Sequence, residues 1–322
     1  MNERIDRNVG LELVRATEAA ALSAGRWMGL GQRDAADDAA TGAMAAVLAT
    51  LDVDARIVIG EEGRSGSPSV LAGGMQIGRG RQHLDMVVDP IDGRRMLAEG
   101  RSGAIAVAAV ALPGAMWSPA PADYADKIVV GPAAAAALVP ECLDAPAAWT
   151  LALVARASGK AVRDLVVFVL DRPRHAALIA EIRTAGARVM LRGDGDVAGA
   201  LMASTPGSQV DLLMGIGGAA EGVIAACAVR ALRGAMLVRL APQYDAERAA
   251  VAAAGIDTRR VLTADELVAG DQIFFAATGI ADGPLLRGVR YAGERAETYS
   301  LVLRNETGTR RSIFAEHVIG AE

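Results

Sequence analysis

The sequence contains few of the residues on which several protein classes depend. It has two cysteines, Cys142 and Cys227, with no Cys-x-x-Cys pair and no disulfide framework. This scarcity fits a reducing compartment, and we therefore expect a cytoplasmic protein. The three histidines, His83, His175 and His317, are scattered and lack the paired spacing of a zinc site.

Long apolar runs and basic tracts are also missing. The longest uncharged stretch, residues 102–122, contains three prolines and is typical of a buried strand followed by a turn, not of a membrane span. Residues 1–12 mix both signs of charge, unlike a signal peptide. Because the net charge is −5 and no basic tail is present, we expect neither a nucleic acid nor a membrane as partner.

Small and aliphatic residues are abundant in this chain of 322 residues. Hydrophobic residues make up 52% and aromatic residues only 3%, which favours closely packed α/β layers with room for two domains. Helical spacing covers residues 9–27 and 37–48, and a stretch rich in Pro, Ala and Gly at 131–147 indicates a domain boundary. Strands are expected at 56–60, 83–88, 105–112 and 127–130.

Strands and helices alternate in the second half, which predicts an α/β layer with parallel strands. The expected strands are 165–170, 188–191, 211–214, 235–240 and 272–276, with helices at 175–185 and from 197 and 220. Residues 299–304 and 309–314 alternate around 305–308 as a hairpin does. We therefore expect one α/β domain over 1–135 and a second over 136–322 that includes the hairpin.

Acidic residues recur directly after the apolar strands. They are Glu61, Glu62, Asp89, Asp92, Asp194, Asp196 and, after a glycine-rich turn, Glu221. The carboxyl ends of strands are where α/β proteins build sites, and gathered carboxylates repel each other unless a cation joins them. Oxygen ligands suit Mg²⁺ or Mn²⁺. Each acid taken singly is also consistent with a helix cap or a turn residue.

Two further patterns suit a phosphorylated ligand. Arg172 and Arg174 flank a proline at a strand-to-helix turn, where they could bind a phosphate or simply face solvent. The run Gly215-Ile-Gly-Gly218 leads into a helix whose backbone N–H groups can receive an anion. The same run, with Ala220, also matches a dinucleotide-binding turn. The following strand, however, carries Arg239 where that interpretation requires an acid.

The pentapeptide Asp89-Pro-Ile-Asp-Gly93 resembles the metal-binding signature of the lithium-sensitive sugar and inositol phosphatase superfamily. Within it, the chain resembles the class II fructose-1,6-bisphosphatases over nearly its whole length. The supporting segments follow the family's order: RATEAA at 15–20, VIGE at 58–61, PRH at 173–175, DGDV at 194–197, GIGGAAEG at 215–222 and ATGI at 277–280.

The resemblance implies a five-layered αβαβα sandwich of two α/β domains, assembled as a homodimer or homotetramer. It implies Mn²⁺- or Mg²⁺-dependent hydrolysis of the 1-phosphate of fructose 1,6-bisphosphate, or of sedoheptulose 1,7-bisphosphate, in gluconeogenesis or pentose-phosphate metabolism. The implied metal ligands are Asp37, Glu61, Asp89, Asp92 and Glu221. The implied substrate contacts are Gly93, Tyr124, Arg172, Arg174, Asp194, Asp196 and Gly218.

The chain departs from the family's pattern at several of these positions. Asp92 replaces a glutamate, Arg172 replaces a lysine, and Gly63 and Ser65 stand where the family has acids. Most important, Arg94 replaces a threonine that helps to position the attacking water, so we count Arg94 among the candidate catalytic residues. It could compete with a metal ion for a carboxylate, stabilise charge on the phosphate, or extend into solvent.

These departures leave two hypotheses. The first is an active phosphatase with a modified mechanism. The second is a catalytically impaired relative that binds or senses sugar phosphates.

Overall fold

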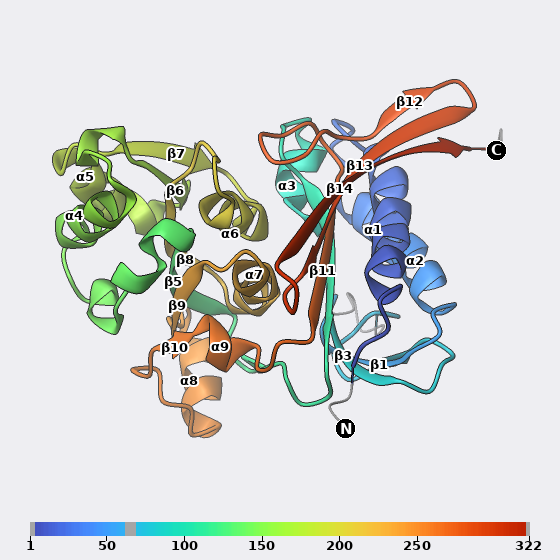
Figure 1. Ribbon diagram of the computed structural model, residues 1–322, viewed down its shortest axis with the longest axis horizontal. Coiled ribbons are helices and arrows are strands. Elements are labelled where there is room, and N and C mark those ends of the chain that lie inside the picture. Colours follow the sequence, from blue (N-terminus) through green and yellow to red (C-terminus); the bar gives the residue numbers. More distant parts are fainter. Residues whose placement is uncertain (1–3, 62–68, 320–322) are drawn as a thin grey trace. The chain divides into compact units, whose positions relative to one another are not determined.

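The computed structural model describes residues 4–61 and 69–319 (Figure 1). The chain divides into two compact units, each with its own β-sheet and helices. Unit 1 comprises residues 1–116 and 270–322, and unit 2 comprises residues 117–269. The expected α/β class is therefore confirmed.

Unit 1 is built on a mixed sheet with strand order β12-β13-β11-β4-β3-β1-β2, in which β14 also pairs with β13. Its helices are α1 (Val9–Gly25), α2 (Arg33–Leu48) and α3 (Arg94–Ala98). Its strands are β1 (Asp54–Ile59), β2 (Gln76–Ile77), β3 (His83–Asp92), β4 (Ile105–Ala111), β11 (Ile273–Gly279), β12 (Arg290–Ala292), β13 (Arg295–Arg304) and β14 (Thr309–Val318).

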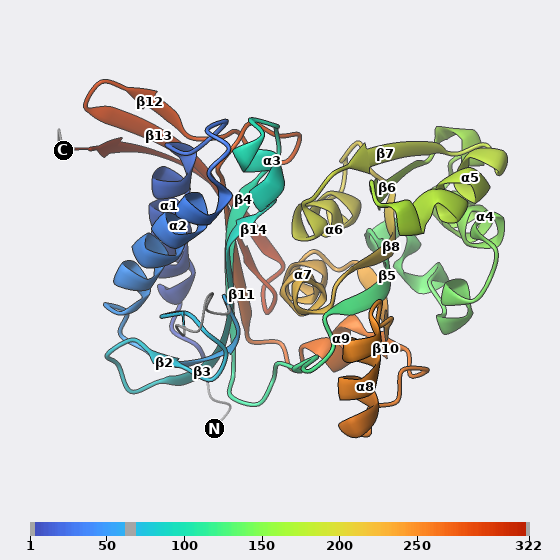
Figure 2. The same ribbon diagram turned by 180° about the vertical axis from the view of Figure 1, so that it is seen from behind.

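Helices α1 and α2 cover one face of this sheet (Figures 1 and 2). Leu13, Ala16, Ala20 and Ala24 of α1 recur at helical spacing and are fully buried, as the pattern predicts. The small alanines allow the helix to lie close to the sheet. Every residue of β4 is buried as well, which explains why that strand shows no alternation of apolar and polar residues.

Unit 2 is a three-layered structure around a sheet with strand order β10-β9-β5-β8-β6-β7. Helices α6 and α7 cover one face, and α4 and α5 cover the other (Figure 2). The strands are β5 (Tyr124–Val130), β6 (Val166–Leu170), β7 (Arg188–Arg192), β8 (Leu212–Gly218), β9 (Ala235–Leu240) and β10 (Leu262–Thr263). The helices are α4 (Ala147–Ser158), α5 (Ala176–Thr184), α6 (Asp196–Ser204), α7 (Ala219–Ala231), α8 (Asp245–Ala253) and α9 (Ala264–Leu267).

The prediction of parallel strands holds for only part of this sheet. Strand β6 pairs in parallel with β7 and β8, but β5 lies between β8 and β9 and runs antiparallel to both. The strands joined by crossover helices therefore share one direction, whereas β5 enters from the preceding segment in the opposite direction. Periodicity identifies each strand but carries no information about its direction in the sheet.

The division of the chain also differs from the expected boundary at residue 135. Strand β5 already belongs to the sheet of unit 2, and β11 returns the chain to unit 1 by pairing antiparallel with β4. The predicted hairpin forms as β13 and β14, in unit 1 and not in unit 2. The physical reason is long-range pairing, since β11 and β4 are separated by the whole of unit 2.

No helix in the described part of the chain is both long and apolar enough to cross a membrane.

Candidate functional site

The acidic pentapeptide of unit 1 lies at the end of β3, where the strand is irregular. The pairing with β4 shifts register between Asp89, opposite Val107, and Asp92, opposite Ile105, so the strand bulges at this point. The Asp89 carboxylate accepts a hydrogen bond from the Ile91 N–H at 3.0 Å, which closes a local turn. The bulge brings two aspartates to the strand end close to α3.

Gly93 lets the chain pass directly from this bulge into α3. Its φ of 101° lies in the left-handed region that favours glycine. A Cβ at this position would also lie 2.8 Å from Met96 Cε. The tight turn therefore requires glycine, and it sets the direction in which the next residue, Arg94, leaves the backbone.

The Arg94 side chain joins two of the predicted metal ligands. Its Nη1 donates to Asp37 Oδ2 at 3.1 Å and to Glu61 Oε2 at 3.2 Å. The side chains of Asp37 and Glu61 are 6% and 14% exposed, against 38% for Arg94. Asp37 comes from α2 and Glu61 follows β1, so the fold brings three separate elements of unit 1 together around one guanidinium group.

The electrostatics show that this guanidinium group is held firmly in its charged form. Burial opposes the charge and by itself would lower the pKa of Arg94. The attraction of Glu61 and Asp37, followed by that of Asp89, outweighs burial and raises this pKa above its ordinary value. Arg94 therefore acts as a fixed cation among carboxylates. The structure contradicts the alternative in which its side chain extends into solvent.

The donor chemistry of this cluster suits a hard divalent cation, because every predicted ligand offers carboxylate oxygens. Arg94, however, already bridges two of those ligands. Within residues 4–61 and 69–319, no group of three or more His, Cys, Asp or Glu is arranged to hold a metal ion. Glu62, Gly63 and Ser65 lie outside the described residues. The chemistry therefore fits a metal ion, provided that Arg94 yields or shares its carboxylates.

In unit 2 the polar residues gather where β6 and β8 end and where α6 and α7 begin. Lys127, in the middle of β5, is 1% exposed, and its Nζ donates to the Asp196 carboxylate and, at 2.6 Å, to the Gly218 carbonyl oxygen. Lys127 thus links the first residue of α6 to the residue that precedes α7. Asp196 is 8% exposed, so this ion pair is almost fully removed from water.

The glycines of the run 215–218 each make room for a functional side chain. A Cβ on Gly217 would overlap the Asp196 carboxylate, and one on Gly218 would overlap that of Glu221. A Cβ on Gly215, whose φ is 120°, would lie 2.9 Å from His175 Nε2. Because carboxylates lie against the last two of these glycines, the run does not offer the anion-accepting surface that the dinucleotide interpretation requires.

His175 fastens the strand-to-helix turn of the predicted phosphate-binding arginines to β8. Its Nδ1 lies 2.7 Å from the Leu170 carbonyl oxygen, and its Nε2 lies 2.8 Å from the Ile216 N–H. A carbonyl only accepts and an N–H only donates, so Nδ1 carries the proton and the ring is neutral. Burial lowers the pKa of His175; the hydrogen bond to the Leu170 carbonyl oxygen opposes this, and the charge of Arg174 adds to the lowering, so the ring stays neutral.

The two predicted phosphate-binding arginines have different environments. Arg174 donates to the Ile216 carbonyl oxygen at 2.8 Å through Nη2, and its guanidinium carbon lies 5.1 Å from the centroid of the Tyr124 ring. The Tyr124 ring in turn makes an edge contact with Tyr244, at 5.8 Å between centroids. Arg172 is paired with Asp194 at 3.6 Å. Four of the predicted substrate residues thus form two local pairs in unit 2.

Sequence patterns missed Lys127 and His175, although each fixes residues that were predicted. The available signal for Lys127 was a charged residue that, together with Asp126, directly precedes the apolar run 128–130, and for His175 it was its place directly after the two arginines. The predicted residues themselves divide between the units. Unit 1 contains Asp37, Glu61, Asp89, Asp92, Gly93 and Arg94, and unit 2 contains Tyr124, Arg172, Arg174, Asp194, Asp196, Gly218 and Glu221.

Comparison with known proteins finds similarity along nearly the entire chain. The sequence model of the family described as bacterial fructose-1,6-bisphosphatase, glpX-encoded, matches residues 7–317. The chain is 39% identical over 327 residues to fructose-1,6-bisphosphatase 1 class 2 of Escherichia coli K12, covering 97% of this chain and 96% of that protein. The proteins named fructose-1,6-bisphosphatase class 2 in Escherichia coli O6:H1 and Shigella flexneri match with the same identity and coverage.

Proposed function

This chain belongs to the family of glpX-encoded bacterial fructose-1,6-bisphosphatases, and we propose that it hydrolyses the 1-phosphate of fructose 1,6-bisphosphate. The observation that carries this proposal is the cluster around Arg94, in which carboxylates from separate elements of unit 1 meet at the end of β3. Sedoheptulose 1,7-bisphosphate is a second substrate to test, because it carries the same pair of terminal phosphates.

We propose that Asp37, Glu61, Asp89, Asp92 and Glu221 hold Mg²⁺ or Mn²⁺. When bound, such an ion polarises a phosphoryl group and lowers the pKa of a bound water. Asp89 also fixes the turn at the end of β3 through its hydrogen bond to Ile91, so it presents its other oxygen in a defined direction. Gly93 allows the backbone to turn closely at this point.

Arg94 has a dual role in this proposal. It supplies positive charge that offsets the repulsion between Asp37 and Glu61, and its part-exposed guanidinium group can donate to a phosphoryl oxygen. It cannot remove a proton from water, because an arginine stays charged at neutral pH. Arg94 also competes with the metal ion, because each carboxylate oxygen that it contacts is one that a metal ion would use.

The residues of unit 2 suit the sugar and the distal phosphate. We propose that Arg172 and Arg174 bind that phosphate and that Asp194 and Asp196 accept hydrogen bonds from sugar hydroxyls. Arg174 is preorganised by the Ile216 carbonyl oxygen and the Tyr124 ring. Asp196 is held by Lys127, which leaves it fewer orientations to lose when a sugar binds.

The direct test is phosphate release from a panel of sugar phosphates, with Mg²⁺, with Mn²⁺ and with a chelator. Metal-dependent release from fructose 1,6-bisphosphate supports the proposal, and the absence of release from every substrate overturns it. Calorimetric binding without release would instead favour the sugar-phosphate-binding relative. We also propose that the protein forms a homodimer or homotetramer, which a measurement of its molecular mass in solution tests. We further propose a cytoplasmic location, which cell fractionation tests.

Replacement of Arg94 decides what this residue contributes. Because it competes for Asp37 and Glu61, we expect Arg94→Thr to raise metal-dependent turnover, up to the range of about 10²–10⁴ that a well-placed nucleophile-activating group supplies. Arg95→Thr is the matched control, since Arg95 is the adjacent arginine of α3 and pairs with Glu99 on the surface. A fall in a robust wild-type rate would show that Arg94 is a working catalytic group.

A further inference from the structure

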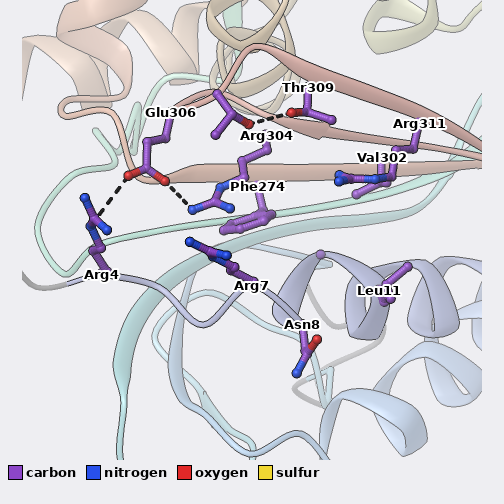
Figure 3. Close-up of a pocket in the computed structure, with 12 residues that line it drawn as sticks. Arg4, Arg7, Asn8, Leu11, Phe274, Val302, Arg304, Glu306, Thr309 and Arg311 are labelled. Atoms are coloured by element: carbon purple, nitrogen blue, oxygen red, sulfur yellow. Dashed lines mark hydrogen bonds and ion pairs between the residues drawn. The ribbon is translucent and has the colours of Figure 1, made fainter.

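A pocket of about 800 Å³ in unit 1 lies apart from the acidic cluster and is strongly basic (Figure 3). Arg4 and Arg7 reach it from the segment before α1, whereas Arg304 and Arg311 come from β13 and β14. Among the described lining residues, Glu306 is the only carboxylate. In a chain whose net charge is −5, this concentration of arginine is unusual and indicates an anionic ligand.

Sheet register brings these side chains to one face. Phe274 lies opposite Arg304, which lies opposite Thr309, and in the adjacent row Val302 lies opposite Arg311. Because alternate residues of a strand share a face, Arg304 and Val302 point the same way and so do Thr309 and Arg311. Arg310 points to the other face and does not line the pocket.

The arginines are only partly neutralised by the protein. Glu306 pairs with Arg4 at 3.7 Å and with Arg304, whose guanidinium carbon also lies 5.2 Å from the centroid of Phe274 (Figure 3). The Nε of Arg304 is buried and has no hydrogen-bond partner in the described structure. Arg7 and Arg311 form no ion pair with any carboxylate of residues 4–61 and 69–319. The pocket therefore keeps an excess of positive charge.

The N-terminus of α1 adds to this charge. Asn8 and Gly10, at the start of this 17-residue helix, line the pocket, and the Asn8 side chain makes no capping hydrogen bond. The partial positive charge of a helix N-terminus favours an anion. Gly10 permits the close approach of α1 to the Phe274 ring, since a Cβ on Gly10 would lie 2.9 Å from Phe274 Cδ1.

We infer that this pocket is a second binding site, separate from the proposed active site, for a small molecule that carries two or more phosphate groups. The forked donors of arginine match phosphate oxygens, and the arginines approach from two different segments, so a ligand with separated charges can engage both sides. A single small anion would leave one side uncompensated. Glu306 already pairs with Arg4 and Arg304, so a ligand must compete with this carboxylate for the two arginines. This competition disfavours ligands that carry little negative charge.

The test uses inorganic pyrophosphate as the probe, titrated by calorimetry into the full-length protein in metal-free buffer with chelator. We expect the double variant Arg7→Ala/Arg311→Ala to bind about 100-fold more weakly, roughly tenfold for each guanidinium group removed. Arg310→Ala is the matched control, because Arg310 is an exposed arginine of the same strand outside the pocket. It should bind as the wild type does.

A second double variant separates this site from the proposed active site. Arg172→Ala/Arg174→Ala should keep pyrophosphate binding if the probe occupies the basic pocket. The inference is overturned if the wild type does not bind pyrophosphate, if Arg7→Ala/Arg311→Ala binds as tightly as the wild type, or if only Arg172→Ala/Arg174→Ala loses binding. None of these results depends on whether the protein hydrolyses a sugar phosphate.

Discussion

Each unit contains a cation that pairs with a buried carboxylate, but the two arrangements differ in burial and in charge balance. In unit 2, the side chain of Lys127 is 2% exposed and pairs with the side chain of Asp196, which is 10% exposed. Arg94 of unit 1 is 38% exposed and meets both Asp37 and Glu61, with Asp89 near enough to act on its charge. The Lys127 pair is buried and its charges balance. The Arg94 cluster is more exposed to solvent and carries more negative than positive charge.

This difference separates a pair with a fixed partner from a cluster that could exchange its cation. A buried pair that is closed by a further hydrogen bond holds the starts of α6 and α7 in place and fixes the orientation of Asp196, and it has no surplus charge with which to attract a cation. A part-exposed cluster with surplus carboxylate charge can still attract a cation, or exchange its guanidinium partner for one.

The largest effect is expected for Lys127→Met, which keeps much of the side-chain volume but leaves Asp196 buried without its cation. We expect the free energy of unfolding to fall by about 3–5 kcal/mol, the usual cost of breaking a buried pair from one side. Urea unfolding followed by circular dichroism measures it. Lys160→Met is the control: Lys160 pairs with Asp211 but is 43% exposed, so its loss should cost about 1 kcal/mol or less. An equal loss of unfolding free energy in Lys127→Met and Lys160→Met would show that burial does not distinguish the two ion pairs.

A smaller and metal-dependent effect is expected for Arg94→Met. In chelator the variant should lose about 1–2 kcal/mol of unfolding free energy, because Asp37 and Glu61 then repel each other and solvent screens only part of the repulsion. Added Mn²⁺ should raise its melting temperature more than that of the wild type, since the competing cation is gone. A wild-type shift as large as that of the variant would contradict competition between Arg94 and the metal ion.

The neutral His175 predicts a pH dependence of stability. Its pKa is lowered in the folded chain, so the unfolded chain takes up a proton first as the pH falls below about 6.5, the ordinary pKa of histidine. Stability should therefore fall with falling pH from that point, by up to about 1.4 kcal/mol per pH unit, until the folded pKa is reached. His175→Gln should lack this slope in urea titrations at a series of pH values. The same slope in both proteins would exclude His175 as its origin.

The smallest effect concerns thiol labelling, which reports on unit 2 alone because it contains both cysteines. Cys142 is 2% exposed and Cys227 is fully buried, and burial raises the pKa of Cys227 to about 12. Neither should react with iodoacetamide in the native protein at pH 8. Lys127→Met should allow labelling at lower urea concentrations, whereas Arg94→Met should leave the urea dependence of labelling close to that of the wild type. Rapid labelling of native wild type would show that unit 2 opens readily.

The basic pocket shows most clearly how far sequence patterns reach in this chain. Arg4 and Arg7 are about 300 residues from Arg304 and Arg311, and nothing in their local sequence relates them. Only the pairing of β11 with β13 and of β13 with β14, together with the position of α1, brings them to one face. A prediction from periodicity identifies the strands but cannot place their side chains in a common pocket.

Local patterns do determine the elements themselves. The helical spacing in α1 and the hairpin around residues 305–308 are confirmed, because hydrophobic periodicity and turn residues act over short distances. The strand expected at 83–88 also forms, but β3 continues through Asp89 and Asp92. The acidic pentapeptide and the glycine run were likewise visible as functional candidates. Their resemblance to one family is confirmed by matches that span nearly the whole chain.

The tertiary structure decided which charges meet. Arg94 is close to Asp92 in sequence, but its Nη1 also bridges Asp37 and Glu61, which come from α2 and from the end of β1. Lys127 reaches Asp196 across 69 residues of sequence, and β11 returns the chain to unit 1 after the whole of unit 2. Such contacts depend on strand order and direction, which arise from long-range pairing and burial. They leave no trace in the local spacing of residues, and for that reason the sequence alone determines this protein's elements and candidate chemistry but not its charge partners.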